Sequence, residues 1–205
     1  HDGYIDGPIL KEKWTSFVGL HPVPVVYGLT IGEYGKMVNG EKWLKNGIQA
    51  KYSIIPMLNY HKKQRYPISE KPSPNLPNEK SVNLYPSLCF FEGTQVSVGR
   101  GTDFPFQVFG SPWLKNYHFK FTPKPNFGAK DPFLNGKICH GEDLRNYAEI
   151  IDKLDLSFVI NAYNNFDKKS KNFFLLPASG KNYWFDTLAG TDELRQQIIE
   201  GKSEE

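Results

Sequence analysis

The chain has 205 residues, which is enough for one large domain or two small ones with a buried core. Its formal net charge is +3, and acidic and basic residues are interspersed along its whole length, so composition argues against a nucleic-acid-binding protein. Basic clusters such as residues 62–65 and 168–169 are short and indicate solvated surface. No apolar run approaches the length of a membrane-spanning helix, so we expect no membrane span.

The residue types that most often hold metals are few and unsuitably spaced. Cys89 and Cys139 show no metal-ligand spacing, and Cys89 falls in an apolar run, where a cysteine packs as a small hydrophobic side chain. No two of the five histidines are four residues apart, as a helical zinc site would require. We therefore expect neither a metal nor another cofactor. The chain begins at His1, so the sequence carries no information on a signal segment.

The N-terminal part of the chain predicts one helix between two strands. Residues 22–28 are typical of a strand that enters a turn. Thr30 and Glu33 fit a capping box, in which the hydroxyl accepts from the N–H three residues later and the glutamate bonds back. The helix that they begin has one apolar face and ends near Gly40. Residues 51–58 alternate weakly and predict an edge strand.

The stretch 72–113 holds the most unusual residues. Prolines and glycines follow one another so closely that we expect no helix of useful length there. The apolar run Leu88–Phe91 predicts a short buried strand that ends on Glu92. Arg100 lies between two glycines, where the backbone turns tightly and leaves the guanidinium accessible. A carboxylate at a strand end facing such an arginine is a common design for a polar ligand site. A structural ion pair that caps loop backbone accounts for the same two residues equally well.

The next part of the chain predicts a strand, a loop and a helix. Residues 117–121 alternate in polarity and indicate a strand. Residues 122–136, rich in proline and glycine, predict a long loop of the kind that is functional or disordered. An apolar stripe with a 3.6-residue period then predicts a long helix near residues 143–166.

The C-terminal part predicts a short strand at 173–175 and a last helix that Thr191 caps and that runs through Ile199. The chain shows no internal repeat and no convincing linker. We therefore expect a single α+β domain over residues 1–205, rich in loops, with a mixed sheet and the long helix as its main elements.

Several short motifs occur in a fixed order along the chain. From the N-terminus they are Phe17–Pro24, Pro72–Pro77, Tyr85–Pro86, Phe91–Thr94, Gly99–Thr102, Pro105–Phe106, Pro112–Trp113 and Leu188–Thr191. Together they resemble the signature of the NamZ family of exo-β-N-acetylmuramidases, a family long described only as a domain of unknown function. The resemblance covers nearly the whole chain.

The resemblance implies a glycoside hydrolase that removes N-acetylmuramic acid from the non-reducing ends of peptidoglycan fragments, in the periplasm or outside the cell. Members of the family pair an N-terminal Rossmann-like domain with a second domain, and the active site lies in the cleft between them. Residues 1–205 resemble the second, C-terminal domain. We therefore expect the Rossmann-like domain to be a partner that is absent from this chain and to carry the main catalytic glutamate.

Within this chain the resemblance implies half of a substrate site. Glycoside hydrolysis usually needs two carboxyl groups, and Glu92 is the candidate for one of them. Arg100 suits the lactyl carboxylate of muramic acid, because a guanidinium binds a carboxylate through two parallel hydrogen bonds. The side chains expected to bind sugar hydroxyl or acetamido groups, or to stack on a sugar ring, are Asn75, Thr102, Tyr85 and Trp113.

Two of these side chains also fit a purely structural role. A turn stabilised by its own side chain accounts for Asn75, and core packing accounts for Trp113. The whole chain also fits a second class of protein, a non-catalytic module that binds glycan or only packs against its N-terminal domain. A half-site requires Glu92, Arg100 and Thr102 to converge on a concave surface, whereas a scaffold buries them in mutual contacts.

Overall fold

The computed structural model describes residues 3–62, 64, 66–147, 152–175 and 182–204. The described elements follow one another along the chain, with 3₁₀ helices labelled η, as β1 Asp6–Ile9, η1 Glu12–Trp14, β2 Pro24–Val26, α1 Ile31–Gly40, η2 Lys45–Gly47, α2 Glu79–Leu88, η3 Cys89–Gly93, β3 Val108–Ser111, β4 Phe119–Phe121, β5 Cys139–Asp143, α3 Ser157–Asn164, α4 Trp184–Ala189 and α5 Glu193–Ile199. No helix in the described part of the chain is long and apolar enough to cross a membrane.

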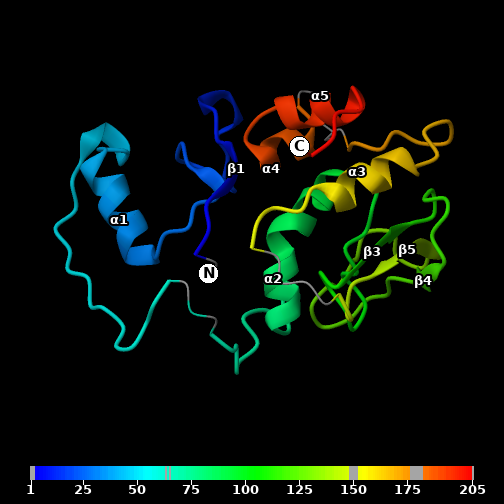
Figure 1. Cartoon of the computed structure of the whole chain (residues 1–205), viewed down its shortest axis with the longest axis horizontal. Coiled ribbons are helices and arrows are strands. Elements are labelled where there is room, and N and C mark those ends of the chain that lie inside the picture. The colour runs from blue at the N-terminus through cyan, green and yellow to red at the C-terminus, as the bar shows by residue number, and fades with distance from the viewer. Residues whose placement is uncertain (1–2, 63, 65, 148–151, 176–181, 205) are drawn as a thin grey trace.

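The strands form two small sheets. Strands β1 and β2 pair with each other, and β5 lies between β3 and β4 in a three-stranded sheet (Figure 1). Gly141 of β5 faces Gly110 of β3, and this close approach needs glycine, because a Cβ on Gly141 would overlap the carbonyl oxygen of Phe109. Every described strand pair is antiparallel. The α+β class is confirmed, but the expected mixed sheet is wrong.

The core is built around the segment formed by α2 and η3. Leu84, Leu88 and Phe91 are fully buried and recur at the four- and three-residue spacing of a helical face. Phe91 stacks on Phe109 of β3, with ring centroids 4.8 Å apart. Burial of each such side chain contributes about 1.5–3 kcal/mol. Helix α4 lies against the other side of η3, where a Cβ on Gly93 would come within 2.5 Å of the Phe185 backbone nitrogen.

Helix α1 stands apart from this core (Figure 1). The predicted capping box is confirmed: the Glu33 N–H donates to Thr30 Oγ1 at 3.2 Å, and the Thr30 N–H donates to Glu33 Oε2 at 2.8 Å. Strand β2 falls within the predicted 22–28 strand. The strand predicted at residues 51–58 is wrong, because this exposed segment has no neighbouring strand to pair with and contains Pro56.

Two predictions for residues 72–113 are also wrong, namely the absence of a helix and the strand at Leu88–Phe91. Asn78 begins α2 with a second capping box, accepting from the Ser81 N–H at 2.9 Å. Pro86 lies in the last turn, where it removes a single backbone donor and the helix continues into η3. The apolar run therefore belongs to a helical face, which a short run alone does not distinguish from a strand.

The long helix predicted near residues 143–166 is wrong in the described part of that range, and residues 148–151 lie outside it. Strand β5 ends at Asp143, and only Ser157–Asn164 are helical. Leu144, Leu154 and Phe158 are all buried, so the apolar stripe reflects burial of three separate segments. The strand within 117–121 is confirmed as β4, and residues 122–136 contain no helix or strand.

The C-terminal predictions hold in part. Phe174 forms an isolated bridge with Thr94 instead of a full strand. The last helix, α5, ends at Ile199 as predicted, but its N-cap residue is Asp192 and not the expected Thr191. The Thr191 hydroxyl oxygen still accepts from the Glu193 N–H at 3.3 Å. Helix α4 was not predicted, because its six residues are too few to show a helical period.

Candidate functional site

Tyr85 and Glu92 both come from the α2–η3 segment. Together with Cys89 they are spaced by four and three residues, which places all three on one face of a helical segment. Glu92 occupies the last turn of η3, just before Gly93 packs against α4. The sequence contains this spacing, but interpretation of Leu88–Phe91 as a strand concealed it.

Arg100 comes from the loop between η3 and β3. Its neighbours Gly99 and Gly101 have φ angles of +77° and +80°, a region that residues with a side chain rarely adopt. A Cβ on Gly101 would also lie 2.6 Å from the Lys124 carbonyl oxygen. The two glycines therefore allow a turn that brings Arg100 back to Glu92.

Arg100 Nε donates to Glu92 Oε1 at 2.9 Å, and the side chains are 35% and 27% exposed. The guanidinium carbon lies 5.0 Å from the centroid of the fully buried Phe106 ring. Within the described part of the chain, the terminal nitrogens Nη1 and Nη2 make no hydrogen bond. The predicted proximity of the carboxylate and the guanidinium is thus confirmed, and the Arg100 side chain remains partly exposed.

The electrostatic environment ties Tyr85 to this pair. The Tyr85 ring packs on Phe106 with centroids 4.8 Å apart and is 37% exposed. Burial raises the pKa of the Tyr85 hydroxyl, and Cys89 and Glu92 raise it further. Burial and Glu92 together raise the pKa of Cys89 to about 12, so this thiol stays protonated and is not a nucleophile at neutral pH. Tyr85, Glu92 and Arg100 form the candidate site.

Thr102 and Asn75 make contacts with backbone nearby. The Thr102 hydroxyl donates to the Gly99 carbonyl at 2.6 Å and accepts from the Phe104 N–H at 3.0 Å. The Asn75 amide donates to the Gly128 carbonyl at 2.7 Å. Both side chains therefore stabilise the loops that frame Arg100, which is a structural role.

Trp113 belongs to a different cluster. Its ring packs against Phe166 at 6.2 Å and lies beneath two ammonium groups, those of Lys137 at 5.5 Å and Lys171 at 5.8 Å. Its backbone carbonyl accepts from the Asp167 N–H. Trp113 is therefore not brought together with the Glu92–Arg100 pair, and core packing accounts for most of its surroundings.

A cavity of about 1270 Å³ in the described part of the chain lies elsewhere, between α1 and α2. None of the six predicted site residues lines it. Its wall includes Ile31 of α1, Ile54 and Ile55 of the exposed segment that follows, and Asn83 of α2. The cavity is predominantly apolar, which suits packing against another apolar protein surface better than binding of a charged sugar.

Sequence reasoning missed one further carboxyl group. Glu142 of β5 is half-buried, and burial followed by the charge of Asp155 raises its pKa. Burial and the nearby Glu142 also raise the pKa of Tyr117 to about 12. The sequence signal for β5 was the two-residue spacing of Cys139 and Gly141, which places Glu142 on the opposite face of a strand. The helix expected from residue 143 onward obscured this signal.

No group of three or more histidine, cysteine, aspartate or glutamate side chains in the described ranges could hold a metal ion. Among its own side chains, the candidate site offers one carboxylate, one guanidinium and one phenol. These groups can bind a carboxylate and hydroxyl groups, and they can transfer a proton.

Comparison with known structures defines the class of fold. The chain superimposes on a DUF1343 family protein from Bacteroides fragilis with a TM-score of 0.88 and 43% identity, over 98% of this chain and 56% of that one. A second DUF1343 family protein from the same organism gives a TM-score of 0.70 over 97% of this chain and 56% of that one, at 18% identity, and so shows the fold alone.

Family comparison is more specific. Residues 83–205 match the C-terminal region of exo-β-N-acetylmuramidase NamZ, and residues 1–80 match its N-terminal region. The chain belongs to the NamZ family. It is 33% identical to the peptidoglycan β-N-acetylmuramidase NamZ of Bacillus subtilis strain 168, over 98% of this chain and 50% of that protein. The chain therefore spans about half the length of this relative.

The position of the two matches bears on domain organisation. We expected the whole of residues 1–205 to correspond to the C-terminal domain, whereas residues 1–80 match the N-terminal region. The boundary falls at the start of α2. Helix α1, which stands apart from the core, lies within the N-terminal match, and the Glu92–Arg100 pair lies within the C-terminal one.

Proposed function

We propose that this chain supplies one side of the substrate cleft of a peptidoglycan-degrading exo-β-N-acetylmuramidase. The enzyme would release N-acetylmuramic acid from the non-reducing ends of glycan strands in the periplasm or outside the cell. The observation that carries the proposal is the partly exposed guanidinium of Arg100, held beside Glu92 and above the Phe106 ring. Two parallel N–H donors match the lactyl carboxylate that distinguishes muramic acid from N-acetylglucosamine.

The proposal gives each of three side chains its own role in substrate binding or catalysis. Arg100 binds the lactyl carboxylate, Tyr85 offers its partly exposed ring and hydroxyl to the sugar, and Glu92 keeps Arg100 in place or takes part in proton transfer. Thr102 and Asn75 act indirectly, because their hydrogen bonds fix the loops around Arg100. Glycoside hydrolysis needs a second carboxyl group in reach of the scissile bond. We assign that group to the N-terminal, Rossmann-like domain.

The apolar cavity supports a partner domain. Ile55, Met57 and Leu58 are 92%, 69% and 89% exposed, and Ile31 of α1 is 84% exposed. Large apolar side chains gathered in this way mark an interaction surface. We propose that the remainder of the N-terminal domain packs here, against the segment that matches the N-terminal family region.

One set of observations favours the alternative, a module without a catalytic role. Glu92 and Arg100 pair with each other, and Thr102 and Asn75 bond to backbone, as in a scaffold. The experiment that separates the two is hydrolysis of a chromogenic β-glycoside of N-acetylmuramic acid by the full-length protein and by its Arg100→Lys variant. Wild-type turnover that is insensitive to this substitution would favour the scaffold.

A further inference from the structure

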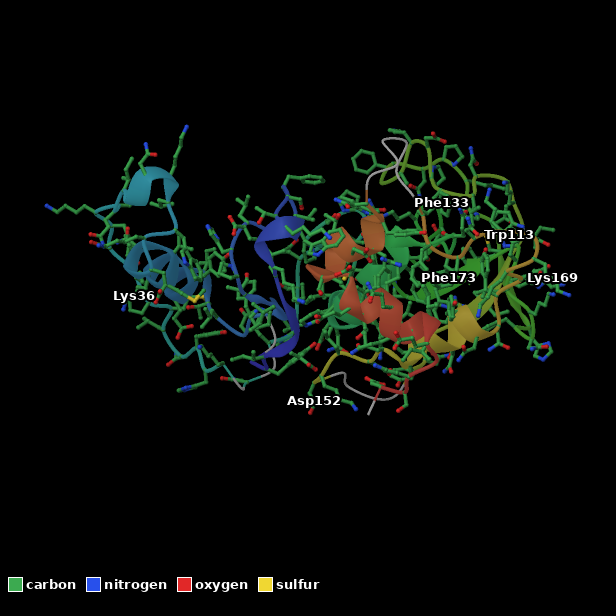
Figure 2. The ribbon with its side chains drawn as sticks, turned by 90° about the horizontal axis from the view of Figure 1, so that it is seen from above. Lys36, Trp113, Phe133, Asp152, Lys169 and Phe173 are labelled. Carbon is green, nitrogen blue, oxygen red and sulfur yellow. The ribbon has the colours of Figure 1, made fainter. Side chains whose placement is uncertain are left out.

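Lys169 and Trp113 lie at the end of the molecule opposite Lys36 of α1 (Figure 2). Lys168, Lys169 and Lys171 are exposed on the loop after α3. With Gln95, Ser170 and Asn172 they line an open groove of about 430 Å³. The described residues that line this groove include no aspartate or glutamate.

Two further lysines extend the positive surface. The first is Lys137, whose ammonium group lies over the Trp113 ring, as does that of Lys171. The second is Lys115, whose ammonium group lies 3.4 Å from the Asp167 carboxylate. We call Lys115, Lys137, Lys168, Lys169 and Lys171 the lysine cluster. Asp167 offsets only one of these charges, and its carboxylate already accepts from the Ser170 hydroxyl at 2.8 Å. The cluster therefore keeps an excess of positive charge.

The loop that carries the cluster is held in place. The Asp167 N–H donates to the Trp113 carbonyl at 2.8 Å, and the Lys171 N–H donates to the Asp167 carbonyl at 3.2 Å. The Lys168 ammonium lies 3.5 Å from the centroid of the Tyr163 ring, and burial lowers its pKa. The loop thus presents several ammonium groups from one fixed backbone, and a surface of one sign of charge attracts partners of the opposite sign.

The composition of the cluster indicates the chemistry of the partner. It contains no arginine, and Arg100, Arg145 and Arg195 all pair with carboxylates elsewhere. Lysines are point charges on flexible stems, which suits anionic groups repeated along a flexible chain better than the fixed geometry of a base edge. The groove also adjoins the segment that carries Glu92, since the Leu175 N–H donates to the Gly93 carbonyl at 3.0 Å.

We propose that the lysine cluster binds a polyanionic chain of sugar or polyol units, one that carries carboxylate or phosphate groups at intervals. This function is separate from hydrolysis and does not depend on it. It would hold the protein on an anionic polymer, with the candidate site close to the bound chain.

Binding of the full-length protein to polygalacturonate, which carries carboxylates, and to polyglycerol phosphate tests the proposal and distinguishes the two sources of charge. The test variant is K168Q/K169Q/K171Q, and the matched control is K36Q/K42Q/K45Q, which removes the same charge near α1. At low salt we expect the test variant to bind at least one polymer about tenfold more weakly, as three exposed ion pairs allow, and the control to bind normally.

Three outcomes would overturn the proposal. They are equal losses in the two variants, which would indicate attraction by net charge alone, failure of the unmodified protein to bind either polymer, and binding of duplex DNA as tightly as both polymers. Thermal melting of each variant verifies that the fold is intact, and all six substituted side chains are exposed.

Discussion

Arg100→Lys tests the proposed recognition of muramic acid most directly. Lysine keeps the positive charge but cannot form two parallel hydrogen bonds. Loss of a charge-assisted contact to the lactyl carboxylate should cost roughly 1–3 kcal/mol of transition-state binding. This corresponds to a fall of about 5- to 150-fold in kcat/KM for the muramic acid glycoside. Activity on the N-acetylglucosamine analogue, which lacks the lactyl group, should barely change.

The effect on stability should be small by comparison. The Glu92–Arg100 pair is about a third exposed, and pairs of this kind contribute about 0–1 kcal/mol. The contact between the guanidinium and Phe106 adds roughly 0.5–1 kcal/mol, part of which lysine retains. A loss of about 1 kcal/mol lowers the melting temperature by roughly 2–4 °C in a chain of this size.

Arg145→Lys is a matched control. Arg145 also pairs with a carboxylate, that of Asp143, and lies 4.0 Å from the centroid of a phenylalanine ring, Phe104. The substitution therefore makes the same chemical change outside the candidate site. It should lower the melting temperature by a similar amount and leave both activities unchanged. If Arg100→Lys instead reduces both activities equally and lowers the melting temperature by more than the control does, Arg100 and Glu92 belong to the scaffold.

Three other predictions use simpler measurements. Residues 1–205 alone should release little or no N-acetylmuramic acid, because one candidate carboxyl group cannot perform both proton transfers, and robust release would contradict the two-domain cleft. Gly101→Ala should destabilise the fold by about 1–3 kcal/mol and more than Gly136→Ala in thermal melting, since both have positive φ but only Gly101 is crowded by backbone. The raised pKa of Glu142 means that folding favours the protonated form, so stability should fall as pH rises above 4.5; Glu142→Gln should flatten that decline, and an unchanged profile would assign it to another group.

Local signals in the sequence predicted local structure well. The capping box at Thr30 and Glu33 needs only four consecutive residues, and the helix that it begins forms as predicted. The strand at Phe119–Phe121 likewise shows its alternation directly. The link between Glu92 and Arg100 was predicted as well, because glycines on both sides of Arg100 allow the turn that joins them.

The wrong strand at Leu88–Phe91 and the wrong long helix near residues 143–166 both come from apolar residues that are buried by tertiary packing. Such burial does not by itself reveal the local secondary structure. Leu88–Phe91 are buried by tertiary packing on every side, so neither a helical nor an extended period is visible in so short a run. Leu144 directly follows β5, Leu154 precedes α3, and Phe158 lies in α3, so their helical spacing does not reflect one continuous helix. The position of Trp113 among lysines depends on contacts with Lys137 and Lys171, which are distant in sequence and could not be predicted.

The two cysteines have a consequence for redox chemistry. Cys89 and Cys139 are unpaired and buried, and burial raises the pKa of each to about 12. At neutral pH only about one thiol in 10⁵ is then ionised, and the thiolate is the form that oxidants and alkylating reagents attack. The folded protein should thus tolerate an oxidising compartment without forming adducts. Both thiols become reactive when the core opens, so the rate of thiol labelling measures how often it opens.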